Sequence, residues 1–168
     1  MVKMYIGNKL IEDIGAPVLS LDDVIGMAFV LTRTRRFNGN PSAFTVAEHL
    51  NLCEEIAEKT GQSEAVSEWA TVHDLHEGAL GDTIAPVKQY IRSDRLRELE
   101  RVWDIAIADA LEIERPTAET YHAVHKIDLI ARRIEMEHMG IEPDDALPPV
   151  PDGLCVLALL RASGVVLK

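Results

Sequence analysis

The chain has very little cysteine. Only two of its 168 residues are cysteines, Cys53 and Cys155, and they stand far apart and in no C-x-x-C pair. This scarcity excludes a disulfide framework and argues against a zinc site built from thiolates. Both cysteines are therefore expected to be small buried hydrophobic side chains.

Basic residues and long apolar runs are also scarce. The chain has 17 Lys and Arg against 28 Asp and Glu, a formal net charge of −11, which argues against binding to polymeric nucleic acid. The apolar run Leu154–Leu160 is much shorter than the about 20 residues that span a bilayer, and Met1–Leu10 lacks the apolar segment of a signal peptide. We expect a cytoplasmic protein with no membrane partner.

Several enzyme patterns are absent. The phosphate loop G-x-x-x-x-G-K-[ST], the dinucleotide fingerprint G-x-G-x-x-G and the nucleophile elbow G-x-S-x-G do not occur. His76-Glu77 begins like the helix of a zinc protease, but Leu80 stands where the second His is needed. These absences remove the corresponding nucleotide-binding and protease classes.

Helix boundaries are well marked. Ser20 with Asp23 and Thr45 with Glu48 have the spacing of helix N-caps. Apolar residues with helical periodicity predict helices at about 20–34, 45–61, 63–79, 93–115, 117–139 and 154–161, and no segment alternates with a period of two. We expect an all-α fold, about six helices around one core in a single domain over 1–168, with Trp69 and Trp103 in that core. The segments 1–19 and 142–153 are expected to be loops or oligomer contacts.

Four residues form a candidate set of metal ligands: His49, the adjacent pair His73 and Asp74, and Asp128. Imidazole nitrogens and carboxylate oxygens suit a divalent ion such as Zn, Mn, Fe, Co or Ni, and four such ligands leave positions open for water and substrate. The spacing predicts that one helix turn presents His73, Asp74 and Glu77 together. Glu77 is expected to orient or deprotonate the attacking water, or to protonate the leaving group.

The order of these ligands, H…HD…D, resembles the pattern of the HD-domain metal-dependent phosphohydrolases, whose fold is all-helical. The stretch HDLHEGALGDTIAPVK at 73–88 resembles the HD…E…GD…P.K pattern of YfbR-like 5′-deoxynucleotidases and bacteriophage DatZ-like deoxynucleoside triphosphohydrolases. RFNG at 36–39 and TVAEH at 45–49 resemble the phage-type form R-F-x-G…V-A-x-H. The resemblance touches about residues 36–133.

The resemblance implies a role for each matching residue. Metal ligation falls to the four candidate ligands, and catalytic roles fall to Asp74 and Glu77. The implied substrate contacts are Asp82 toward the deoxyribose 3′-hydroxyl, Arg36 and Lys88 toward phosphate oxygens, Phe37 as a wall of the pocket, and Pro86 in the same stretch. Because Phe37 replaces the Trp of YfbR-like enzymes, base and sugar selectivity do not transfer.

The resemblance also implies cofactors and partners. It implies one divalent transition metal (Zn, Co, Mn, Fe or Ni), with room for additional Mg or Mn on the substrate phosphates, and a small-molecule nucleotide as substrate. It further implies a homo-oligomer, a dimer or a hexamer, for which the apolar tail at 154–167 is available as a contact. A phage-encoded protein acting in the host cytoplasm stays open.

Three functions remain open. A DatZ-like enzyme that removes triphosphate from dATP or a related dNTP is favoured over a YfbR-like 5′-deoxynucleotidase that releases phosphate from dNMPs. A non-catalytic nucleotide-sensing module with the same fold is the alternative from another class.

Individual residues also have structural alternatives. Asp82 is a candidate cap for a turn at 83–84, and Arg36 is a candidate partner of Glu48 or another carboxylate. His76, His122, His125 and His138 are expected at the surface, with a second metal site at His122 and His125 left open.

Overall fold

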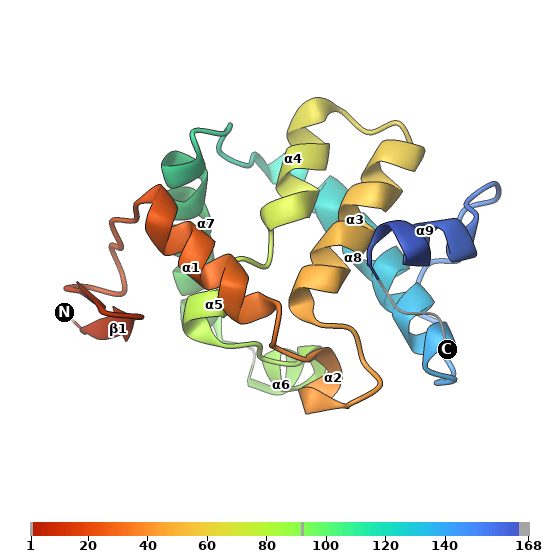
Figure 1. Cartoon of the computed structure of the whole chain (residues 1–168), viewed down its shortest axis with the longest axis horizontal. Coiled ribbons are helices and arrows are strands. Elements are labelled where there is room, and N and C mark those ends of the chain that lie inside the picture. The colour runs from red at the N-terminus through yellow and green to blue at the C-terminus, as the bar shows by residue number, and fades with distance from the viewer. Residues whose placement is uncertain (1, 92, 165–168) are drawn as a thin grey trace.

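The computed structural model describes residues 2–91 and 93–164, and it is mostly helical (Figure 1). The helices in these ranges are α1 (Leu21–Leu31), α2 (Arg36–Gly39), α3 (Val46–Lys59), α4 (Glu64–Val72), α5 (Glu77–Leu80), α6 (Ala85–Ile91), α7 (Asp94–Leu111), α8 (Ala118–His138) and α9 (Val156–Ala162). An antiparallel hairpin of β1 (Met4–Ile6) and β2 (Lys9–Ile11) precedes them. The predicted all-α class is confirmed.

The predicted helix starts are confirmed in detail. Ser20 accepts a hydrogen bond from the backbone of Asp23, whose side chain accepts one from the Ser20 backbone in return. Thr45 and Glu48 form the same reciprocal arrangement at the start of α3. Both boxes satisfy backbone N–H groups that a helix N-terminus leaves without partners.

Three predictions about elements were wrong. The segment 1–19, expected to be a loop, contains the hairpin, whose strands of three residues are too short to show an alternating pattern. The helix expected over 63–79 ends at Val72. Just after it, the His73 side chain bonds the Ala70 carbonyl oxygen and so competes with the backbone N–H groups that would continue the helix. A further helix, α6, occupies 85–91, a segment that is not among the predicted helices.

The apolar interior consists of two clusters rather than the single core expected. One lies among α3, α4, α8 and α9 and contains Trp69, and the other lies among α1, α3, α7 and the hairpin and contains Trp103. The two tryptophans are 1% and 0% exposed, as predicted. Helix α3 contributes to both clusters, Leu50 to the second and Cys53 to the first, and His49 is buried on the same helix.

The cysteines and the C-terminal apolar segment differ in their surroundings. Cys53 is buried as predicted, but Cys155 is exposed because it precedes α9 at the end of a loop. Leu159 and Leu160 of α9 pack into the first cluster, so part of the tail expected at an oligomer contact fills the chain's own interior. Residues 165–167 of that tail lie outside the described ranges.

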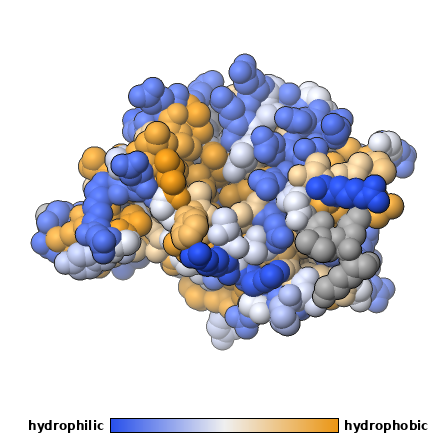
Figure 2. Space-filling model, viewed as in Figure 1, coloured by the Kyte–Doolittle hydropathy of each residue, from blue (hydrophilic) through white to orange (hydrophobic). Residues whose placement is uncertain are grey.

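Figure 2 shows hydrophobic side chains gathered on the surface over α1. The exposed ones there include Leu21, Ile25 and Phe29, spaced four residues apart along the outer face of the helix. Within the described ranges, no helix is both long and apolar enough to cross a membrane.

Gly78 sets the distance between α5 and α1. A Cβ atom at this position would lie 2.6 Å from the Met27 backbone oxygen, so the two helices touch here without a side chain between them. Glu77 is the preceding residue, and its position therefore depends on this close approach.

We predict that Gly78→Ala lowers the free energy of unfolding by about 2 kcal/mol, because the added methyl group overpacks against backbone atoms that cannot rotate away. Gly26→Ala is the matched control, since a Cβ atom there meets nothing within 4 Å and Ala favours the helix interior by about 0.5–1 kcal/mol. Urea unfolding measures both. A Gly78→Ala protein as stable as the unmodified chain would contradict the packing described.

Candidate metal centre

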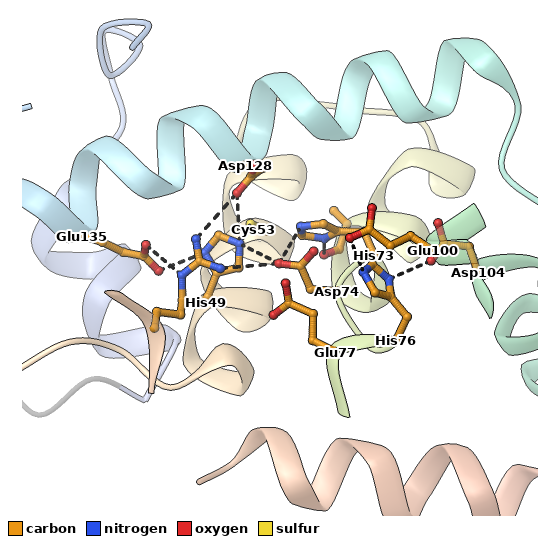
Figure 3. A network of polar contacts seen from close by, with 12 residues as sticks. His49, Cys53, His73, Asp74, His76, Glu77, Glu100, Asp104, Asp128 and Glu135 are labelled. Carbon is orange, nitrogen blue, oxygen red and sulfur yellow. Dashed lines mark hydrogen bonds and ion pairs between the residues drawn. The ribbon is translucent and has the colours of Figure 1, made fainter. Parts of the chain in front are cut away.

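The four predicted ligands come together from three separate segments (Figure 3). His49 lies in the middle of α3, His73 and Asp74 lie in the turn after α4, and Asp128 lies in the middle of α8. His49 Nε2 is 3.2 Å from Asp128 Oδ1 and 3.8 Å from Asp74 Oδ2. Asp74 Oδ2 is also 3.6 Å from His73 Nε2. Asp74 therefore lies near both imidazoles, and Asp128 joins the group through His49.

The proton positions on His73 follow from its hydrogen bonds. Its Nδ1 lies 2.9 Å from the Ala70 carbonyl oxygen, which only accepts, so Nδ1 carries the hydrogen. Its Nε2 is buried and has no hydrogen-bond partner among the described residues. When the imidazole is neutral, its Nε2 lone pair faces a carboxylate oxygen of Asp74 with no hydrogen between them, an arrangement that a cation would satisfy.

His49 is oriented by Glu135, a residue on α8 two turns after Asp128. His49 Nδ1 lies 2.9 Å from Glu135 Oε1, and neither side chain is exposed. Because a carboxylate accepts, the Nδ1 hydrogen points to Glu135 and Nε2 points to Asp128 and Asp74. A carboxylate that fixes the outer nitrogen of a ligating His is a usual feature of metal sites.

Arg36 lies among the same carboxylates. Its guanidinium is 3.1 Å from Glu135, 3.4 Å from Asp74 and 3.9 Å from Asp128. Burial alone would raise the pKa of Asp74, but His73, His49 and Arg36 together lower it to about 2. The pKa of Asp128 is lowered as well, because the bond from His49 and the charges nearby outweigh its burial. Both carboxylates are therefore charged at neutral pH.

Protonation of His49 competes with metal binding. Burial and the neighbouring Arg36 favour its neutral form, but the carboxylates of Glu135 and Asp128 outweigh them and raise its pKa well above the usual value. A proton on Nε2 then occupies the place of a cation between His49 and Asp128. Since only a neutral imidazole coordinates metal, binding a divalent ion at this site releases that proton.

Two groups of side chains here are close enough to hold a metal ion. One contains His49, Cys53 and His73, and the other contains Asp74, His76 and Glu77, each with ligand atoms within 4.8 Å of one another. Sequence reasoning treated Cys53 only as a hydrophobic residue, yet its sulfur lies 3.5 Å from His49 Nε2. Burial raises the pKa of the Cys53 thiol, so it stays protonated and is a weaker ligand than the carboxylates.

Glu77 stands beside this cluster at the start of α5 and is 5% exposed. Its Oε2 is buried without a hydrogen-bond partner among the described residues, and its Oε1 lies 3.7 Å from Lys88 Nζ. Burial, with the negative charges of Asp74 and Asp82, raises the pKa of Glu77 to about 8. A carboxyl group in this environment can take up or release a proton near neutral pH.

A pocket of about 470 Å³ opens over the site, a size that suits a small molecule. It is lined by Arg36, Phe37, Asn38, Asp74, Glu77, Asp82, Thr83, Ile84, Ala85, Pro86, Lys88, His125, Asp128 and Arg132. The five side chains predicted to contact substrate thus share one pocket with two predicted ligands and Glu77. Phe37 and Asn38 adopt left-handed backbone angles at the wall of this pocket, with φ of 52° and 58°.

The structure corrects several predictions about the site. His73, Asp74 and Glu77 do not lie on one helix, because α4 ends at Val72 and α5 begins at Glu77. His76 is buried rather than at the surface, because its Nδ1 bonds Asp104 at 2.9 Å; despite its burial, this bond raises the pKa of His76 to about 9.

The structure also places the other residues for which the sequence left alternatives. His122, His125 and His138 are exposed, as predicted, although His125 also lines the pocket. Arg36 pairs with the carboxylates of Asp74 and Glu135, so the alternative that it pairs with a carboxylate is correct. Glu48 is not one of its partners, because Glu48 bonds the backbone of Thr45. Asp82 precedes α6 by three residues and lines the pocket half-buried.

Sequence reasoning missed Glu135 and Arg132. Both lie on the face of α8 that carries Asp128: Arg132 is four residues after it and Glu135 seven, and His125 lies three residues before it. Residues with this spacing share one side of a helix. Extending the helical period from Asp128 would have identified all three.

Neither a scan against models of known protein families nor a search of curated proteins finds a match to this chain.

We predict that Glu135→Gln weakens binding of Zn²⁺ or Mn²⁺ by about 10–100-fold, because the neutral amide offers one acceptor where the carboxylate holds both His49 and Arg36. Isothermal titration calorimetry measures the affinity. Glu137→Gln is the control, since Glu137 is an exposed residue of the same helix. Unchanged affinity in a folded Glu135→Gln protein would show that Glu135 does not orient a ligand.

Proposed function

We propose that the chain is a divalent-metal-dependent phosphohydrolase that acts on a deoxynucleotide. One observation carries the proposal: two imidazoles and two carboxylates meet at the wall of a pocket, beside a buried glutamate that has a free oxygen. The orphaned Nε2 of His73 supports a cation there, because no donor among the described residues reaches it.

His49, His73, Asp74 and Asp128 would hold the ion, which when bound polarises a phosphoryl oxygen and lowers the pKa of a water molecule. Glu77 is placed next to Asp74, so its free oxygen can orient the attacking water and take its proton. The water oxygen forms a bond to phosphorus, the bond from phosphorus to the leaving oxygen breaks, and the leaving oxygen receives a proton. Lys88, 3.7 Å from Glu77, holds that carboxyl group at the pocket.

The charges of the pocket support an anionic substrate only together with a metal. Its lining has three Lys or Arg side chains against four Asp or Glu side chains, so the residues alone do not attract phosphate. A divalent ion would reverse this balance, which links metal binding to substrate binding. Phe37 offers the half-buried aromatic ring of this lining for a base, and Asp82 offers an acceptor for a sugar hydroxyl.

Within this class we favour a DatZ-like enzyme that releases triphosphate from dATP or a related dNTP, on the resemblance at 36–39 and 45–49. A YfbR-like 5′-deoxynucleotidase acting on dNMPs is the second candidate. A nucleotide-sensing module without catalysis is disfavoured, since a module of this kind would tolerate loss of a ligand or of Glu77, and all of them are present.

The test is product analysis after incubation with each dNTP, NTP and dNMP in Mn, Co, Mg or Zn. We expect metal-dependent hydrolysis that a chelator stops, and we expect Asp74→Asn and Glu77→Gln each to lower kcat by about 100-fold or more. Asp109→Asn is the control, because Asp109 is exposed on α7 and pairs with the exposed Arg115, away from the pocket.

The products separate the candidates. Triphosphate and nucleoside from a dNTP identify the first, and orthophosphate from dNMPs alone identifies the second. Nucleotide binding without turnover under any metal would identify the sensing module, and an Asp74→Asn protein with full activity would refute catalysis at this site.

A further inference from the structure

Helix α8 presents a polar stripe to the pocket and to the interior beneath it. His125, Asp128, Arg132 and Glu135 follow one another at intervals of three, four and three residues, so they share one side of the helix. The first three line the pocket, and Glu135 is fully buried against His49 and Arg36. Asp128, a candidate metal ligand, thus has a basic side chain one turn away on either side.

The cations predicted from the sequence to hold phosphate are already matched by carboxylates. Arg36 is 13% exposed and lies within 4 Å of Asp74, Asp128 and Glu135. Lys88 Nζ is 2.9 Å from Glu100 and 3.7 Å from Glu77. Both side chains therefore balance negative charge of the protein itself.

Arg132 is different. Within residues 2–91 and 93–164 its side chain makes no ion pair and no hydrogen bond, although it is half-buried and lines the pocket. The next residue, Arg133, is by contrast bonded to the carbonyl oxygens of Leu147 and Pro148. Asp128 and Glu135, the acidic residues on the same stripe, are bonded to His49, and Arg36 is near both. Arg132 is left with a charge that a ligand can use.

We infer that Arg132 forms a subsite for the outer phosphates of a polyphosphate chain. The inference rests on the proposed function, which puts the reacting phosphate at Asp128. Arg132 is one turn further along α8, about 6 Å by the rise of the helix, and so lies beyond a phosphate at the metal ligands. A guanidinium at that position contacts a second or third phosphate by paired hydrogen bonds. It contributes little to the binding of a monophosphate.

The experiment measures binding of inorganic tripolyphosphate, pyrophosphate and orthophosphate to the chain loaded with one equivalent of Zn²⁺ and freed of excess metal. We expect Arg132→Gln to weaken tripolyphosphate binding by about tenfold or more and orthophosphate binding by less than about twofold. Arg132→Lys, which keeps the charge, should restore part of the loss. Lys126→Gln is the matched control, because Lys126 is an exposed residue of α8 outside the pocket.

Other outcomes overturn the inference. Unchanged tripolyphosphate binding in a folded Arg132→Gln protein removes the subsite, and an equal loss for all three anions, or the same loss in Lys126→Gln, shows a general effect of charge.

Nucleotide hydrolysis, measured in parallel, keeps the two proposals distinct. Turnover that is unaffected by Arg132→Gln for both dNTP and dNMP leaves the proposed function standing without the subsite. Absence of turnover, with the predicted loss of tripolyphosphate binding, leaves the subsite standing without the enzyme.

Discussion

The site depends on one buried carboxylate, that of Glu135. It accepts a hydrogen bond from His49 on one oxygen and from Arg36 on the other, in a place that solvent does not reach. A buried carboxylate is costly unless its lone pairs are bonded, and these two bonds satisfy it. They also fix the direction of His49 Nε2 and the position of the guanidinium that lowers the pKa values of Asp74 and Asp128. The direction of one candidate ligand and the charge of two others therefore depend on this contact.

The fold places these groups by bringing three helical segments to one point. Helix α3 is shared between the two apolar clusters, and it carries the buried His49. Helix α8 packs along α3 and brings Asp128 and Glu135 to the same imidazole. The turn after α4 supplies His73 and Asp74, and Gly78 lets α5 approach α1 so that Glu77 lies beside them. Packing of apolar residues thus decides where the polar residues meet.

Much of this could be predicted from the sequence, for reasons that differ by residue. The N-caps at Ser20 and Thr45 are local, since a short side chain and an acid three residues later are sufficient, and both were correct. The four candidate ligands were identified by their chemistry and spacing, and the substrate-contact residues by resemblance. The structure brings both sets together, and their roles stay predictions. The break after Val72 could not be predicted, because the apolar period continues through it while the bond from His73 to Ala70 does not show in a pattern. Glu135 was missed because an acidic residue on a long charged helix is normally taken to be at the surface.

The left-handed backbone at Phe37 and Asn38 bears on how the pocket meets a ligand. Residues with a side chain in this region are less stable by about 1–2 kcal/mol each, so the surrounding structure must hold them there. The segment is closed at its base by backbone hydrogen bonds from Arg36 to Phe44 and from Val46 to Thr34. The aromatic wall of the pocket is consequently ordered when the chain folds. Binding a molecule there therefore costs little conformational entropy in the segment that forms the wall. More of the contact energy is then available as binding affinity.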